Sequence, residues 1–243
     1  MFDGNDNKKQ KRNKMKEQTK EEIHIAPPNI KMGEVWIKGT APLVMHKFSH
    51  KAKMQIKAKQ EAGTTATKNR KKEAKNFEDC FNESRHISFE GWDGIPAAAF
   101  RNACISACRL VGFKMTYAKM SLFVKEDGWD RDEGTPLVRI ISDNPPRMLE
   151  SMVRIGGITK TVDISVRPQW LDWGARLRFK YDADQFTASD VINLIARAGL
   201  QCGICEGRPD SSNSTGMGWG TFEVVYDENE INKLKEKMSH DAA

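Results

Sequence analysis

The stretch "GIPAAAFRNACISACRLVGF", residues 94–113, carries the strongest fold signal in the chain. Pro96 suits the first position of a helix, where its missing N–H has no partner to lose, and Gly112 suits the left-handed residue that ends one. Between them an apolar stripe recurs at helical spacing, formed by Phe100, Ala103, Cys104, Ala107, Cys108 and Val111. The pattern predicts a helix from Pro96 to about Val111. Its many small side chains indicate close packing against a sheet.

A second helix and several strands surround this element. Thr187 and Asp190 have the spacing of a capping box at the start of a predicted helix over 187–200, which Gly199 closes. Runs rich in β-branched and aromatic residues predict strands at 33–48 (bent near Gly39), 116–129, 135–142, 164–170, 176–181 and 220–227. Without its insertions the order is β-α-β-β-α-β. This order predicts an α+β fold with a ferredoxin-like or RNA-recognition core.

Positive charge is concentrated in particular segments. The chain holds 39 Lys and Arg against 33 Asp and Glu, a net charge of +6. We expect a disordered basic arm over 1–28, one domain over 29–227 and a polar C-terminal helix and tail over 228–243. The domain carries a basic, partly flexible insertion over 48–85, after the first strand. The cations of this basic run are Lys47, Lys51, Lys53, Lys57, Lys59, Lys68, Arg70, Lys71, Lys72 and Lys75.

The basic run predicts contact with nucleic acid, because so many cations on one flexible segment cannot serve core stability. The alternative is a solvated surface. The predicted strand over 176–181 also concentrates positive charge, since Arg176, Arg178 and Lys180 share one of its faces. That face is a candidate nucleic-acid surface or an ordinary solvated outer face.

A glycine-rich loop, "GRPDSSNSTGMGWGTFEV" at 207–224, lies between the second helix and the last strand. This order excludes the dinucleotide-binding and P-loop motifs, which need a strand before the glycines and a helix after them. Bare backbone at Gly216 and Gly218 would let a nucleic-acid strand or a neighbouring subunit approach closely, with Trp219 available to stack. The alternative is a hairpin entry with Trp219 in the core.

Other candidate chemistry is weaker. Cys202 and Cys205 have the spacing of a metal or redox pair, but no further ligands are suitably placed, so we interpret them as packing residues and expect no metal and no cofactor. His46 or His50 could act as a general base toward an RNA 2′-hydroxyl, and the alternative for His46 is a polar residue at a strand end. Five cysteines, an odd number, and the lack of a long apolar run predict a cytoplasmic protein.

Two of these motifs resemble the repeat-associated mysterious protein (RAMP) superfamily of CRISPR systems. "GIPAAAFRNACISACR" is similar to the entry to its first helix, and "LIARAGLQCGICEGRPDSSNSTGMGWGTFEV" to its ending. Small phage-encoded proteins have similar endings. Among RAMP proteins the chain most resembles the backbone subunits that coat guide RNA. The resemblance implies that the insertion, Arg101, Arg208 and the glycine loop hold phosphates.

These observations predict a non-enzymatic protein of a bacterial cell or a phage-infected host. It would bind single-stranded RNA or DNA without sequence preference and form a homo-oligomer, a filament or ring, along the strand, alone or with other nucleoprotein subunits. One alternative is a RAMP-type endoribonuclease that processes guide RNA. Another is a phage-encoded mimic that interferes with a host defence complex.

Overall fold

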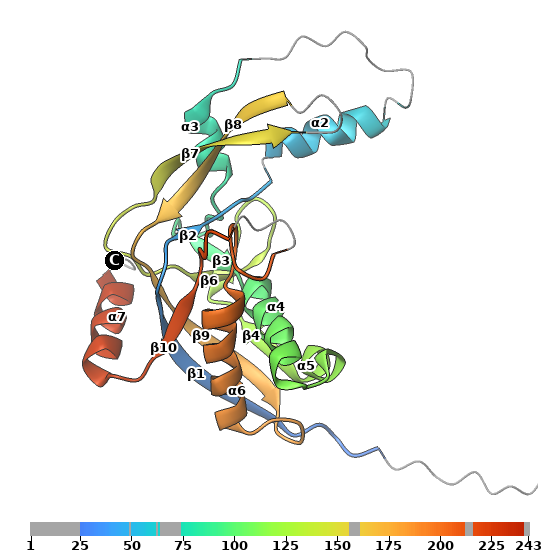
Figure 1. Ribbon diagram of the computed structural model, residues 1–243, viewed down its shortest axis with the longest axis vertical. Coiled ribbons are helices and arrows are strands. Elements are labelled where there is room, and N and C mark those ends of the chain that lie inside the picture. Colours follow the sequence, from blue (N-terminus) through green and yellow to red (C-terminus); the bar gives the residue numbers. More distant parts are fainter. Residues whose placement is uncertain are drawn as a thin grey trace, which may run out of the picture.

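A computed structural model describes residues 25–48, 50–61, 63, 74–155, 161–211 and 216–240. The chain is a mixed structure of helices and antiparallel sheets, consistent with the predicted α+β class (Figure 1). A body of sheet and helices carries an extension formed by a long hairpin and two helices.

The body is centred on a four-stranded sheet with the order β10-β1-β9-β4, in which each neighbouring pair is antiparallel. β1 is a central strand, and its alternating side chains separate two faces because successive residues point to opposite sides. The strands are β1 (Ile30–Gly39), β4 (Leu122–Lys125), β9 (Gly174–Asp182) and β10 (Phe222–Val225).

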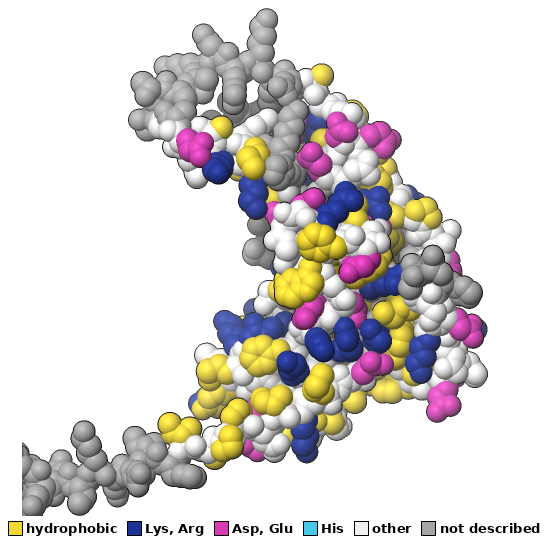
Figure 2. All heavy atoms as spheres, turned by 180° about the vertical axis from the view of Figure 1, so that it is seen from behind, with side chains coloured by type: hydrophobic (Ala, Val, Ile, Leu, Met, Phe, Trp, Pro, Cys, Tyr) yellow, Lys and Arg dark blue, Asp and Glu magenta, His cyan; other side chains and the backbone are white. Residues whose placement is uncertain are grey.

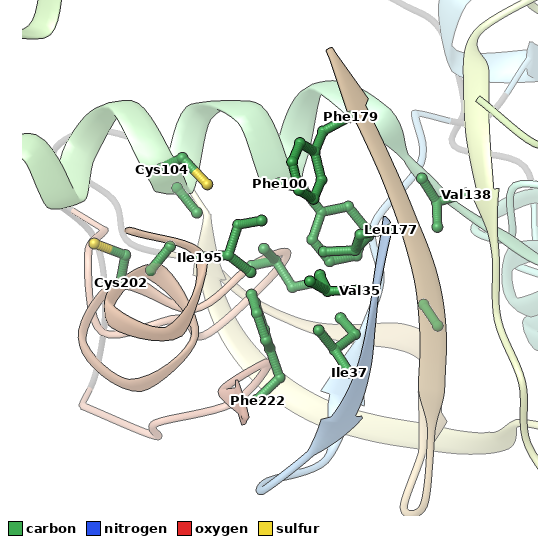
Figure 3. Close-up of a cluster of buried hydrophobic side chains, with 14 of the residues drawn as sticks. Val35, Ile37, Phe100, Cys104, Val138, Leu177, Phe179, Ile195, Cys202 and Phe222 are labelled. Carbon is green, nitrogen blue, oxygen red and sulfur yellow. The ribbon is translucent and has the colours of Figure 1, made fainter. Parts of the chain in front are cut away.

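Helices cover one face of this sheet, which we call the inner face (Figure 1). They are α4 (Ala97–Ala107), continued by a 3-10 turn η2 (Cys108–Val111), α5 (Met115–Ser121), and α6 (Ala188–Arg197), continued by a π-helical turn η3 (Ala198–Cys202). Phe100 of α4 and Ile195 of α6 meet Leu177 of β9 in a continuous core (Figure 3). The helix predicted from Pro96 is confirmed, as is the capping box of Thr187 and Asp190.

The opposite side of the sheet, the outer face, is covered only in part. The C-terminal helix α7 (Glu228–His240) packs Ile231, Leu234 and Met238 against buried Trp36 and Val225. The predicted polar helix therefore has an apolar stripe and belongs to the body of the fold.

The extension is built on a hairpin of β7 (Arg147–Ile155) and β8 (Thr161–Trp170), which pairs with β2 (Leu43–Val44) at its base. Helix α3 (Phe77–Glu83) packs against β8, and helix α2 (His50–Glu61) lies toward the same end of the molecule in Figure 1. A third, small sheet has the order β3-β6-β5, from β3 (Gly94–Pro96), β5 (Gly128–Trp129) and β6 (Pro136–Arg139).

Three strand predictions need correction. The strand predicted over 116–129 begins as helix α5, whose Ala118 is fully buried against the core, and only β4 and a two-residue strand at 128–129 are extended. The strand predicted over 164–170 is the second half of β8, whose partner β7 was not predicted at all. The strand predicted over 33–48 is divided into β1 and β2, which belong to different sheets. The strands predicted over 135–142, 176–181 and 220–227 lie near their predicted positions.

Candidate nucleic-acid interface

Within the described part of the basic run, several lysines are paired with carboxylates. Lys53 pairs with Glu133 at 3.1 Å, Lys57 lies 3.9 Å from Glu61 within α2, and Lys75 lies 3.5 Å from Asp163 of the hairpin. Some predicted contacts lie outside the described residues: Lys68, Arg70, Lys71 and Lys72 entirely, and His50, Lys51 and Lys59 in their side chains.

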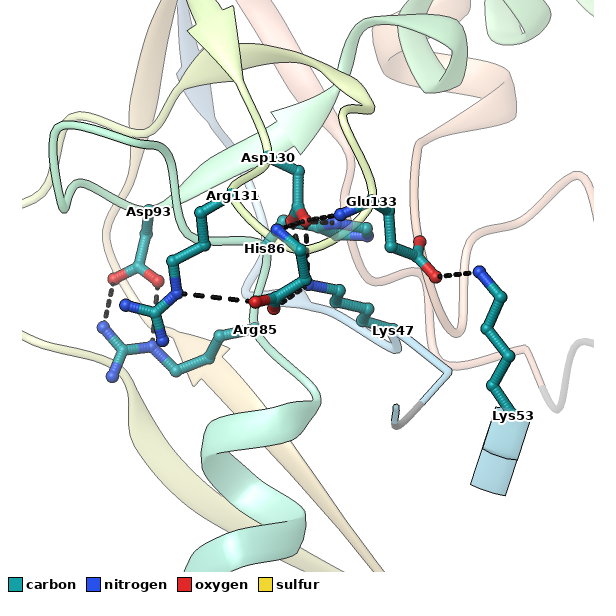
Figure 4. A network of polar contacts seen from close by, with 9 residues as sticks. Lys47, Lys53, Arg85, His86, Asp93, Asp130, Arg131 and Glu133 are labelled. Atoms are coloured by element: carbon teal, nitrogen blue, oxygen red, sulfur yellow. Dashed lines mark hydrogen bonds and ion pairs between the residues drawn. The ribbon is translucent and has the colours of Figure 1, made fainter. Parts of the chain in front are cut away.

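The prediction that Lys47 contacts nucleic acid needs correction, because its side chain is buried and already paired. Its ammonium donates to both carboxylate oxygens of Asp130 at 3.0 Å and to Asp132 at 2.7 Å (Figure 4). Lys47 is 5% exposed and Asp130 is fully buried. An ammonium held this way cannot contact a phosphate on the surface.

Hydrogen bonds fix the charges of this cluster. Burial opposes ionisation of Asp130, but hydrogen bonds from Lys47 and from the backbone N–H groups of Glu133 and Asp132 outweigh it and lower the pKa of the carboxyl. Burial likewise disfavours the Lys47 ammonium, yet its hydrogen bonds to Asp132 and Asp130 raise its pKa. Both groups are therefore charged at neutral pH.

Arg176 and Arg178 point to the outer face of the sheet as predicted, but both are engaged. Asp127 accepts a hydrogen bond from Arg176 at 3.1 Å and from Arg178 at 2.9 Å. The guanidinium groups thus tie β9 to the segment that follows β4. The third cation of the strand, Lys180, is exposed.

Arg101, which the sequence resemblance places at a phosphate, is engaged within the protein. Its guanidinium donates to the backbone oxygens of Leu122, at 2.9 Å, and Lys119, where α5 passes into β4. It lies over the ring of Phe123, with 5.1 Å between the guanidinium carbon and the ring centroid. Arg101 is therefore a structural residue that also fixes an aromatic ring.

A polar groove, here called the α4 groove, runs between α4 and the segment 203–211. Its volume is about 530 Å³. It is lined by small residues such as Ala99 and Ala103 and by polar ones, including His46, Asn102, Ser106, Arg208 and Ser211. It therefore lies between the first predicted helix and a segment that includes the start of the glycine loop.

The acidic groups of the α4 groove are paired with arginines. Glu206 accepts from Arg167 at 2.8 Å, and Asp210 pairs with Arg109. Burial disfavours ionised Asp210, but hydrogen bonds from Ser106 and Arg109 hold the pKa of its carboxyl below the usual value. Arg208 donates one hydrogen bond to the backbone oxygen of Cys205, at 2.9 Å. A guanidinium carries five N–H donors, so it keeps donors for a ligand.

His46 is one of the residues that line the α4 groove. Burial, together with the positive charge of Arg167, lowers the pKa of His46, although Glu206 opposes this effect. The imidazole is therefore neutral at pH 7 and can accept or donate a hydrogen bond.

The glycines near the groove differ in how much space a side chain would have. A Cβ on Gly220 would lie 2.0 Å from the oxygen of Ile204, and one on Gly207 would lie 2.5 Å from the ring of Trp219. By contrast, a Cβ added at Gly216 or Gly218 would have no other atom within 4 Å. The indole of Trp219 is partly buried against Gly207, so it is a packing residue in part and not a free stacking surface.

The cysteines occupy packing positions. Cys104 and Cys202 are buried between α4 and η3 (Figure 3), and Cys108 is fully buried. Burial raises the pKa of both Cys104 and Cys205 to about 12, so these thiols are protonated at neutral pH.

Sequence reasoning missed Asn102 and Ser106. Both stand on the predicted first helix, four residues apart, beside its apolar stripe. A polar pair at that spacing lies on one helix face and was the available signal.

Comparison with models of known protein families and with curated proteins gives no match for this chain. Within the described ranges, every helix is too short or too polar to cross a membrane.

Proposed function

We propose that this chain binds single-stranded nucleic acid without sequence preference and assembles along the strand as a non-catalytic coat protein. We also propose that the sheet β10-β1-β9-β4, with α4 and α6, is a ferredoxin-like core related to that of RAMP proteins. The strand order and the positions of the two helices in the chain support this assignment.

The α4 groove carries the functional proposal. Its acidic side chains are paired, Arg208 has unused donors, and Ala99 and Ala103 leave room for a backbone to approach. Arg167 and Arg109, which lie outside the lining, pair with the groove carboxylates of Glu206 and Asp210, and Arg208 adds a positive charge within the lining. A polymer with one phosphate per residue fits such a groove better than a small neutral ligand does.

The test is fluorescence anisotropy with labelled single-stranded RNA and DNA homopolymers of about 30 nucleotides. Arg208→Ala should weaken binding about tenfold or more, since a charge-assisted hydrogen bond contributes roughly 1.5–3 kcal/mol. It should also reduce the salt slope by about 0.7. Arg197→Ala, at an exposed arginine ending α6, is the matched control. Absence of strand binding by the wild-type protein at low salt would contradict the proposal.

The hairpin supports the proposed assembly. Met152 is 83% exposed and stands directly opposite Ile164 across β7 and β8, beside exposed Val162. Apolar side chains on a protruding element suit a contact with another copy of the chain. Electron microscopy with and without a strand should show filaments or rings that depend on the strand, and monomers in both samples would remove this part of the proposal.

One observation favours endoribonuclease activity as a second candidate. His86 also lines the α4 groove, and its Nδ1 lies 3.0 Å from Asp130, the arrangement by which a carboxylate orients a general base. Cleavage of RNA, but not of DNA, that disappears in His86→Ala or His46→Ala would favour the enzyme over the binder.

A further inference from the structure

We infer that the uncovered half of the outer sheet face is a platform on which bases of a single strand stack. This inference rests on the proposed function and adds a second surface to it. Helix α7 covers the outer face over Trp36 of β1 and Val225 of β10. The part formed by β4, β9 and the first residues of β1 carries exposed side chains.

Three side chains form a row across this uncovered half. In the register of the sheet Met32 of β1 pairs with Lys180 of β9, and Lys180 pairs with Phe123 of β4. Met32 is 62% exposed and Phe123 is 42% exposed. Neighbouring strands are about 4.8 Å apart, so the row spans roughly 10 Å. The result is an apolar side chain, a cation and an aromatic ring side by side.

The aromatic ring is held ready for a ligand. The Arg101 guanidinium lies over Phe123 and is itself fixed by the backbone oxygens of Leu122 and Lys119. A ring whose position is already set loses little conformational entropy when a base stacks on it. Arg101 is a positioning residue here.

The charges next to the row favour a polyanion. The adjacent row consists of Glu34, Arg178 and Lys125, and Asp127 already holds Arg178. Within the part of the chain that the structure describes, Lys125 and Lys180 make no ion pair with a carboxylate. In Figure 2, which shows the molecule from behind, Lys and Arg side chains gather with hydrophobic ones next to the hollow in its outline.

Single-stranded nucleic acid matches both properties of the platform. Each base offers an apolar π-face to Phe123 and Met32, and each phosphate can reach Lys180 or Lys125. Stacking on an aromatic ring contributes about 1–3 kcal/mol per base without sequence preference.

The experiment combines affinity with photo-crosslinking. A single strand carrying 5-iodouracil should crosslink to the peptide that contains Phe123. Phe123→Ala should weaken binding about fivefold to a hundredfold, the loss of one stacked base, with the salt slope unchanged because the ring touches no phosphate. Phe123→Trp should retain affinity. Lys180→Gln should instead lower the salt slope by about 0.7.

Phe89→Ala is the matched control, because Phe89 is 69% exposed and lies outside the platform. Circular dichroism and thermal melting of each variant separate lost binding from lost folding. If the wild-type protein binds a strand while Phe123→Ala behaves like Phe89→Ala and crosslinks map elsewhere, the platform is overturned and the proposed function stands. If the wild-type protein binds no strand, both are overturned.

Discussion

Lys47 and Asp130 show that charged residues, which usually lie on the surface, can be buried in the interior. The pair joins the end of the first strand region to a turn 83 positions further along the chain, and His86 contacts the same carboxylate. A buried carboxylate that keeps its charge requires such partners, since an unpaired charge inside a protein is very costly.

Lys47→Met should therefore be strongly destabilising. The substitution leaves the fully buried Asp130 without its cation, and removing one partner of a buried pair costs about 3–5 kcal/mol. Urea denaturation measures the change in the free energy of unfolding. Lys53→Met is the control: its ion pair with Glu133 involves a lysine side chain that is 62% exposed, and it should change stability by at most about 1 kcal/mol. Equal losses in the two variants would contradict the structural role of Lys47.

The sequence could not separate these two lysines. Both lie in one basic run, and only the partner of Lys47, distant in sequence, makes it a buried residue. In the same way Arg176 and Arg178 were correctly assigned to one strand face by alternation, whereas their shared partner Asp127 depends on how β4 ends beside β9. Alternation within one strand carries no information about such partners.

Glycines between Gly203 and Gly220 share a positive φ but differ in how closely other atoms pack against them. Gly218 and Gly220 have the same φ of 67°, yet only Gly220 lies against another backbone segment. Positive φ costs a residue with a side chain about 1–2 kcal/mol. Close packing adds a second cost at one of the two positions.

Gly220→Ala should consequently lose about 3 kcal/mol or more of unfolding free energy, because its Cβ would lie 2.0 Å from the oxygen of Ile204. Gly218→Ala should lose only about 1–2 kcal/mol, the cost of the conformation alone. Thermal or urea unfolding of the two variants provides the comparison. Similar losses would show that the contact at Gly220 is not a constraint.

Elements with strong end signals could be predicted, and elements defined by long-range contacts could not. The helix over 97–107 and the one over 188–197 have start and stop signals within their own residues. Helix α5 has only 7 residues and contains Thr116 and Tyr117, which favour strands, so its helical form depends on packing. The β7-β8 hairpin exposes Met152 and Val162, which conceals the alternation expected of a strand.

The molecule as a whole presents two candidate contacts for one strand, the α4 groove and the outer-face platform. The groove is lined by the inner-face helix α4, and the platform lies on the opposite face of the sheet. A strand that touched both would have to pass around the edge of the sheet. The hollow in the outline of the molecule lies next to the cationic side chains of Figure 2.

Affinity should rise steeply with strand length. A strand of about 60 nucleotides should bind at least about a hundredfold more tightly than one of about 6, since linked sites on one strand raise the effective concentration of each contact. Anisotropy titrations over a series of lengths measure this. Affinity that stays constant beyond the site size of one molecule would show that copies bind independently.

The narrow row of Met32, Lys180 and Phe123 has a consequence for selectivity. A row of roughly 10 Å accommodates one or two bases, which together contribute about 2–6 kcal/mol. Since about 4 kcal/mol corresponds to a millimolar dissociation constant, the platform of a single molecule captures a short fragment poorly. Avidity would then discriminate by length: an intact strand is retained, and its degradation products are released.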